Sequence, residues 1–176
     1  MTIFETKRLL VNTLKQKDED IFVELLSDPK IIDPASHQKT DMKEVMRKFK
    51  LNLKLGAIPI KNQDNIWGIF EKESSEMIGI GALLTNNKGD WELGYRFRPK
   101  YWGHRFGTEV ANGMVEYCFK NLCFEKITAD VDIENIASVK ILEKIMTPIM
   151  EYNNEEDRCI DRRYEIKRKN WLQQRV

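Results

Sequence analysis

The stretch from Trp91 to Lys144 constrains the fold of this chain more than any other. Residues 91–99 alternate apolar and polar side chains with the period of two that is typical of a half-buried strand. The turn over residues 100–107 contains two glycines, and apolar residues at helical spacing follow it. Another strand is predicted over residues 126–132. A strand that leads through a glycine-containing turn into a helix places unpaired N–H groups and positive potential at the helix start, which favours a bound anion such as phosphate.

The length and composition of the chain indicate one domain covering residues 1–176. A chain of this length buries roughly 70% of its unfolded surface and can support a core without disulfide bonds or a structural metal ion. Its 29 Lys and Arg residues nearly balance its 28 Asp and Glu residues, so the net charge of +1 gives no global field that would attract nucleic acid or an anionic membrane. Any anion site must therefore be local.

The cysteines and the N-terminus suggest an intracellular protein. Cys118, Cys123 and Cys159 are an odd number, and they have neither a Cys-x-x-Cys spacing nor a neighbouring histidine. This pattern argues against a disulfide framework and against a zinc site, so we expect no metal. The N-terminus lacks the features of a signal peptide, and the longest apolar stretch, residues 78–84, is too short to span a bilayer. We expect a soluble, cytoplasmic protein.

The order of the predicted elements indicates an α+β fold. Strands are expected at residues 8–14, 65–71, 77–84, 91–99, 126–132, 149–152 and 163–167. Helices are expected after Asp18, from Asp41 until Gly56 stops the second one, after Gly107, and over residues 136–145. The order β-α-α-β-β-β-α-β-α-β-β predicts a mixed, mostly antiparallel sheet of about seven strands flanked by about four helices. The tail, residues 162–175, is interpreted as an edge strand with a frayed end.

Several motifs in this order resemble the GNAT N-acetyltransferases. They are Glu92-Leu93-Gly94-Tyr95, Tyr101-Trp102-Gly103, Gly107-Thr108-Glu109, Asn135-Ile136-Ala137-Ser138 and Leu142-Glu143-Lys144. The opening residues 4–10 and Ser27-Asp28-Pro29 are similar to the branch that includes the ribosomal-protein N-terminal (alanine/serine) acetyltransferases. The resemblance covers nearly the whole chain. It implies a GNAT-like fold and the transfer of an acetyl group from acetyl-CoA to a primary amine, either a protein N-terminus or a small molecule.

In that family the pyrophosphate of coenzyme A binds a Gln/Arg-x-x-Gly-x-Gly/Ala turn. Aligned with it, this chain has Trp102 first, Arg105 at the first glycine position and Gly107 at the last. Arg105 either blocks this pyrophosphate-binding turn, the cradle, or adds a charge-assisted hydrogen bond to the bound phosphate. We expect a working cradle, because a helical φ would tolerate arginine and the neighbouring N–H groups remain. Those groups belong to His104, Phe106, Gly107 and Thr108.

The resemblance also implies contacts along the pantetheine arm and near its sulfur. The backbones of Phe97 and Arg98 would hold pantetheine where the strand splays from its neighbour, with a bulge near Gly94. Many relatives place a tyrosine on the helix after the next strand, but the corresponding residue here is Leu142. In the related branch Asn135 and Ser138 occupy this region. The Ser138 hydroxyl would donate to the thiolate, whereas the alternative is that Asn135 simply caps the helix.

The acceptor amine must lose a proton before it attacks. Glu92 is the first candidate base and Glu151 the second, and each is alternatively a solvated surface carboxylate. His37 and His104 are further candidates because of their titration range. Lys144-Ile145-Met146-Thr147 departs from the usual Lys-Leu-Gly-Phe, which leaves the acceptor open. The alternative function is a non-catalytic GNAT-like module for acyl-CoA sensing or partner binding, and the protein is expected to be a monomer or a homodimer.

Overall fold

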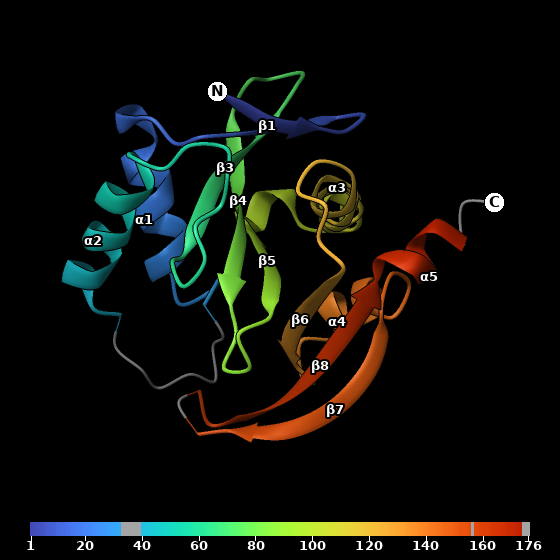
Figure 1. Ribbon diagram of the computed structural model, residues 1–176. Helices are drawn as coiled ribbons and strands as arrows, with labels where there is room; N and C mark the ends of the chain where they lie inside the picture. Colours follow the sequence, from blue (N-terminus) through green and yellow to red (C-terminus); the bar gives the residue numbers. More distant parts are fainter. Residues whose placement is uncertain (33–39, 156, 174–176) are drawn as a thin grey trace.

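The computed structural model describes residues 1–32, 40–155 and 157–173, and within them eight strands form one mixed sheet (Figure 1). The spatial order is β1-β2-β3-β4-β5-β6-β8-β7. Neighbouring strands are antiparallel except β5 and β6, which are parallel. The α+β class with a mixed, mostly antiparallel sheet is therefore confirmed. The strands are Thr2–Glu5 (β1), Leu9–Asn12 (β2), Asn65–Glu71 (β3), Met77–Thr85 (β4), Trp91–Phe97 (β5), Lys126–Asp132 (β6), Thr147–Asn154 (β7) and Cys159–Lys167 (β8).

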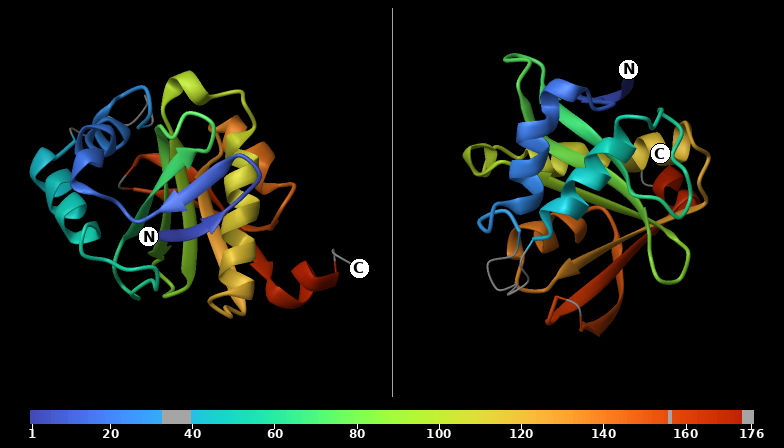
Figure 2. Two further views of the ribbon diagram at one scale, coloured as in Figure 1. Left: turned by 90° about the horizontal axis from the view of Figure 1, so that it is seen from above. Right: turned by 90° about the vertical axis from the view of Figure 1, so that its left-hand side faces the viewer.

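Helices cover both faces of this sheet (Figures 1 and 2). One face carries α1, Glu19–Ser27, and α2, Met42–Asn52, while the opposite face carries α3, Phe106–Lys120, and α4, Ile136–Leu142. A short helix α5, Arg168–Gln173, follows β8. The start of α2 follows from its sequence, because the Asp41 side chain accepts a hydrogen bond from the N–H of Lys43.

Each helical layer has its own apolar core, because the sheet presents side chains to both sides. Phe22 and Leu25 of α1 pack with Val45 and Phe49 of α2 against Ile80 of β4. On the other side, α3 is the centre of a larger cluster whose fully buried side chains include Val110, Met114, Cys118 and Phe119. The middle strands β4, β5 and β6 lie between these two layers.

The structure corrects four details of the sequence prediction. β1 was not predicted, because this four-residue edge strand has no buried side chain and so shows no buried-exposed alternation. The second helix ends at Asn52, four residues before Gly56. The tail is not an edge strand, because β8 lies between β6 and β7 and β7 forms the edge. Residues 168–173 then form α5 rather than a frayed end.

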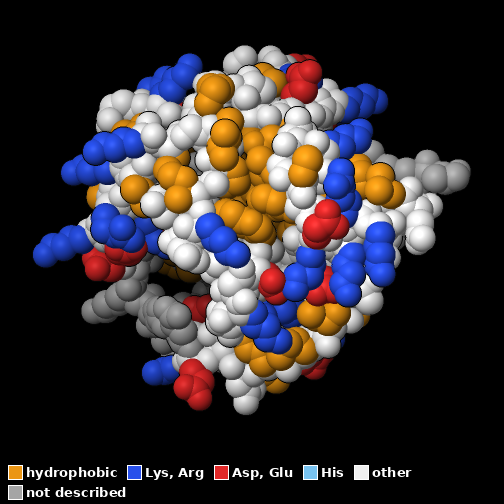
Figure 3. Space-filling model, in the orientation of Figure 1, with side chains coloured by type: hydrophobic (Ala, Val, Ile, Leu, Met, Phe, Trp, Pro, Cys, Tyr) orange, Lys and Arg blue, Asp and Glu red, His pale blue; other side chains and the backbone are white. Residues whose placement is uncertain are grey.

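The surface seen in the orientation of Figure 1 has hydrophobic side chains gathered near its centre and charged side chains of both signs around them (Figure 3). This distribution agrees with the nearly balanced composition. Within the part of the chain that the structure describes, no helix is both long and apolar enough to cross a bilayer.

Candidate active site

The cleft that could hold a substrate opens where β5 and β6 diverge. Both strands lie within the described residues, and a single residue pair, Glu92 opposite Thr128, joins them. Beyond this pair lies a cleft of ≈ 580 Å³, lined by β5, β6, α4 and residues from the α1/α2 layer. The bulge expected near Gly94 is absent, because the register of β4 and β5 runs unbroken from Gly79 opposite Phe97 to Thr85 opposite Trp91. Divergence from β6 therefore opens the cleft without a bulge.

The two residues expected to contact pantetheine through their backbones differ in availability. The Arg98 N–H donates to the Ile78 carbonyl at 2.9 Å, and the Arg98 carbonyl accepts from the Tyr101 N–H at 2.9 Å. Arg98 therefore does not fit the backbone role that the resemblance implied. The Phe97 carbonyl accepts from Nε1 of Trp102 at 2.8 Å. Because ladder hydrogen bonds alternate, the N–H of Phe97 points away from β4 and remains a candidate contact.

The turn before α3 offers unpaired N–H groups, although its conformation differs from the prediction. Arg105 has φ +63° and ψ +15°, so the expected helical φ is wrong. Gly103 also has a positive φ, +80°. The first intrahelical hydrogen bond joins the Glu109 N–H to the Arg105 carbonyl at 3.2 Å, and no side chain caps the helix at Arg105. The N–H groups of Phe106, Gly107 and Thr108 therefore lack intrahelical acceptors at the positive end of the helix dipole.

An ion pair fixes this turn to the N-terminal strands. Nε of Arg8 lies 2.7 Å from the Glu109 carboxylate, which also accepts from the Thr6 hydroxyl at 2.6 Å. The other end of the Arg8 guanidinium donates to the His104 carbonyl at 3.1 Å, and the guanidinium carbon lies 4.3 Å from the centre of the Phe106 ring. The charge of Glu109 at the helix start is thereby directed toward Arg8.

Two hydroxyl groups lie where β5 faces α4. Tyr95 lines the cleft, and its ring lies next to the start of α3, since a Cβ on Gly107 would be 3.4 Å from the ring. The Tyr95 hydroxyl is buried and makes no hydrogen bond within the described residues. Burial raises the pKa of Tyr95 to about 12, and an interaction with Ser138 opposes this shift. Ser138 also lines the cleft, and its N–H donates to Oδ1 of Asn135 at 3.1 Å, so Asn135 caps α4 as the alternative interpretation held.

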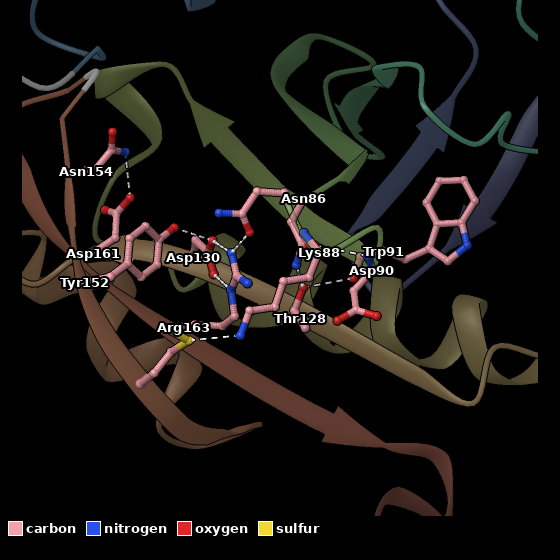
Figure 4. Close-up of polar contacts among 12 residues, drawn as sticks. Asn86, Lys88, Asp90, Trp91, Thr128, Asp130, Tyr152, Asn154, Asp161 and Arg163 are labelled. Carbon is pink, nitrogen blue, oxygen red and sulfur yellow. Dashed lines mark hydrogen bonds and ion pairs between the residues drawn. The ribbon is translucent and has the colours of Figure 1, made fainter.

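Glu92 lines the cleft next to the buried ion pair of Asp130 and Arg163. Figure 4 shows this pair and its hydrogen-bond partners. Burial raises the pKa of the Glu92 carboxyl to about 7, and the negative charge of Asp130 adds to this effect. Asp130 is held in turn by Arg163, whose Nε and Nη2 lie 2.7 and 2.6 Å from its two oxygens. The Tyr152 hydroxyl donates to the same carboxylate at 2.6 Å. A carboxyl group that titrates near neutrality is suited to exchange protons with a substrate.

The described lining of the cleft is strongly acidic. It includes six carboxylates and two cationic side chains, and one of the cations, Lys48, lies 2.7 Å from the carboxylate of Asp64. The excess of negative charge favours a positively charged guest. The carboxylates are Asp64, Glu92, Asp130, Asp132, Asp157 and Asp161, and the cations are Lys48 and Arg96.

The other candidate bases lie outside this lining. Glu151 is exposed on the edge strand β7, and its carboxylate lies 2.7 Å from Nη2 of Arg162. His104 is exposed in the turn, where its Nδ1 lies 3.0 Å from the Trp102 carbonyl and its ring stacks on Phe106. His37 falls in residues 33–39, outside the described part of the chain. The geometry therefore places Glu92 in the cleft and separates it from Glu151 and His104.

Sequence reasoning missed Tyr95 and Asp130. It looked for a phenol on the helix after β6, whereas the described cleft lining contains Tyr95 from β5 and Tyr152 from β7. Alternation along β5 was the available signal, because it places Tyr95 on the same side of the strand as the buried Leu93 and Phe97. For Asp130 the signal was its position between the buried Ala129 and Val131 of β6.

Comparisons with known proteins identify relatives over most of the chain. A family model described as an acetyltransferase (GNAT) domain matches residues 8–145. A Bacillus licheniformis protein named as an uncharacterized N-acetyltransferase, p20, is 25% identical over 167 residues, which cover 92% of this chain and 93% of that protein. The uncharacterized N-acetyltransferase YnaD of Bacillus subtilis is 28% identical over 146 residues, which cover 80% of this chain and 79% of that protein.

Solved structures share the fold over nearly the same length. An acetyltransferase (GNAT family) from Bacillus anthracis superimposes with a TM-score of 0.78 at 18% identity, covering 96% of this chain and 99% of that one. A spermidine N-acetyltransferase from Vibrio cholerae, solved in complex with CoA and spermine, gives a TM-score of 0.76 at 17% identity, covering 94% and 98% of the two chains. At these identities the likeness concerns the fold.

Proposed function

The chain belongs to the GNAT family of N-acetyltransferases, and from that premise we propose that it transfers the acetyl group of acetyl-CoA to a primary amine of a small cationic acceptor. Acetyl-CoA supplies the acetyl group as an activated thioester. In our proposal the pyrophosphate binds the N–H groups of Phe106, Gly107 and Thr108, and the pantetheine arm follows the N–H of Phe97 into the cleft. The Tyr95 hydroxyl supports this placement of the pantetheine arm. It is a buried polar group without a hydrogen-bond partner among the described residues, and the sulfur of the bound coenzyme would supply that partner.

The acid lining of the cleft is the observation that supports a cationic acceptor. The described lining contains six carboxylates but only two cationic side chains. A protonated amine is attracted to such a site, and additional positive charges on the acceptor increase the attraction. The Vibrio cholerae structure contains spermine, which carries several amines. The shared fold alone does not select an acceptor, so the preference of this chain depends on its own carboxylates.

The two faces of β5 divide the work of the reaction. Glu92 accepts a proton from the acceptor ammonium, which leaves a neutral amine. The amine nitrogen then bonds to the acetyl carbon while the carbon–sulfur bond breaks. Hydroxyl groups of Tyr95 and Ser138 donate hydrogen bonds to the departing sulfur, where negative charge develops. The nitrogen loses its second proton and the sulfur gains one, so each turnover releases one proton.

Two measurements test this proposal in sequence. Calorimetric titration with acetyl-CoA should give a 1:1 binding signal. Thiol release is then followed with spermidine, a linear monoamine of similar length and a tripeptide with a free N-terminus. We expect kcat/KM to be highest for spermidine and to fall with added salt, because the carboxylates attract its extra charges. Binding without turnover of any amine would instead support the non-catalytic acyl-CoA-sensing module, and a preference for the monoamine would refute a cationic acceptor.

A further inference from the structure

The buried pair Asp130–Arg163 lies directly beside Glu92 without contributing a group that the proposed reaction uses. The two residues stand opposite each other on the antiparallel strands β6 and β8. The Arg163 side chain is 2% exposed and that of Asp130 11%. Two charges removed from water to this degree are costly to keep unless they serve packing, specificity or function. Their position therefore calls for a reason beyond strand pairing.

The contacts of Asp130 leave its carboxylate little freedom. Arg163 binds both of its oxygens, at 2.7 and 2.6 Å, and the Tyr152 hydroxyl adds a third hydrogen bond at 2.6 Å. Nη2 of Arg163, which binds Asp130, also donates to Oδ1 of Asn87, at 3.2 Å, in the hairpin before β5. Elements from β6, β7, β8 and the β4–β5 turn thus fix the orientation of one carboxylate.

That carboxylate lies on the path along which β5 and β6 separate. Glu92 pairs with Thr128, and Asp130 is two residues farther along β6, so its side chain leaves the strand on the same face as that of Thr128. Both carboxylates line the cleft. A fixed negative charge beside a second, partly buried carboxyl group makes the proton on that group harder to remove.

We propose that Asp130, fixed by Arg163 and Tyr152, is a positioning residue that prepares Glu92 to take the proton of the acceptor amine. The inference rests on the proposed function. Burial and Asp130 together hold the pKa of Glu92 near 7, while Arg163 opposes them. Asp161 on β8 acts in the same direction as Asp130, and Asp132, Lys48 and Arg96 are further charged groups of the cleft lining. A stronger base that is still ionised at neutral pH removes an ammonium proton more effectively.

The decisive variant is Asp130→Asn, which keeps the size of the side chain and removes its charge. The titration of Glu92 is followed in the free protein by NMR of the labelled carboxyl carbon, and the pH profile of kcat/KM is measured beside it. In the wild type the Glu92 resonance and the acid limb of the profile should both have midpoints near 7. In Asp130→Asn both midpoints should move down, toward the ordinary value for a glutamate.

Asp130→Asn leaves the cation of Arg163 buried without its counter-charge, so this variant could fail to fold. A second variant keeps the test possible in that case. Asp130→Asn/Arg163→Gln removes both charges and keeps hydrogen-bonding groups at both positions. It should also lower the midpoint, but by less, since the opposing effect of Arg163 is lost as well. Arg162→Gln on the same strand is the matched control, because Arg162 pairs with the exposed Glu151 outside the cleft and its loss should leave both midpoints in place.

The outcomes separate this inference from the function on which it rests. An unchanged Glu92 midpoint in both Asp130 variants would overturn the inference even in an active enzyme. A lowered NMR midpoint without a matching shift of the kinetic limb would overturn the role of Asp130 in proton transfer. A protein whose Glu92 titration responds to Asp130 but that acetylates no amine would overturn the proposed function, and the catalytic role of the pair with it.

Discussion

At the scale of single residues, the arginine at the start of α3 is the clearest conflict between sequence and conformation. Arg105 holds φ +63°, a left-handed backbone that costs a residue with a Cβ about 1 kcal/mol. The turn therefore keeps the conformation that glycine favours without having glycine there. Its exposed position lets the side chain extend into solvent or toward a phosphate.

We expect Arg105→Gly to raise the free energy of unfolding by about 0.5–1 kcal/mol, because the relief of strain exceeds the added flexibility of the unfolded chain. Urea unfolding measures this change. Gly103→Ala is the opposed control, since φ is +80° at Gly103 and a Cβ there would meet nothing within 4 Å, so any loss of stability reports backbone strain. Weaker coenzyme A binding by Arg105→Gly would indicate a phosphate contact, and tighter binding would indicate obstruction.

We expect the hydroxyl of Tyr95 to contribute little to the stability of the fold. Because its buried oxygen lacks a hydrogen-bond partner among the described residues, Tyr95→Phe should keep or raise stability by up to about 1 kcal/mol. If the hydroxyl donates to the leaving sulfur, kcat should fall about tenfold with little change in KM. Tyr152→Phe is the comparison, since it loses a bond to Asp130 and should destabilise by about 1–2 kcal/mol. A kcat for Tyr95→Phe equal to that of wild type would exclude this role, and Ser138→Ala would then test the remaining hydroxyl.

At the scale of elements, the proposed reaction puts the acetyl donor and the acceptor amine on opposite faces of β5. Gly94 lines the cleft on the same face of β5 as Glu92, and a Cβ built there would meet nothing within 4 Å. Gly94→Val should therefore leave the fold intact, because valine suits a strand, while its methyl groups occupy the acceptor space. We expect KM for the amine to rise several-fold and acetyl-CoA affinity to stay constant. Gly81→Ala on β4 is the control, since its Cβ would make ordinary contacts with Met114 outside the cleft; equal KM values for the two variants would contradict this division.

The elements also show how much of the structure could be predicted from the sequence. The ranges of β3 and β6 were predicted to the residue, because each is a short run of apolar and strand-favouring residues, which is a local signal in the sequence. The position of β8 inside the sheet was not predictable from chain order, since β7 pairs back onto it from outside. The same limit applies to the site. Glu92 was identified from its own strand, whereas the acid lining joins residues as distant as Asp64 and Asp161, which only the tertiary structure brings together.

At the scale of the whole molecule, two carboxyl groups should give the stability opposite dependences on pH. The pKa of Glu92 is raised to about 7, so between pH 4.5 and 7 the folded protein binds more protons than the unfolded chain. Its contribution to stability is therefore present below pH 4.5 and is lost as the pH rises through 7. The pKa of Glu76 is lowered to about 2 by hydrogen bonds from Lys100 and Tyr101, so its contribution is present above pH 4.5 and is lost as the pH falls toward 2.

Replacing each carboxyl group separates the two effects. Glu92→Gln should be more stable than wild type by about 1–2 kcal/mol at pH 8, after allowance for partial solvation of the site, and the difference should vanish below pH 4.5. Glu76→Gln should be less stable than wild type at pH 8, with the difference shrinking as the pH falls toward 2. Urea unfolding at pH 4, 6 and 8 measures both. A stability gain for Glu92→Gln that does not change with pH would mean that Glu92 carries its ordinary pKa in the folded protein, and the proton-accepting role assigned to it would lose its physical basis.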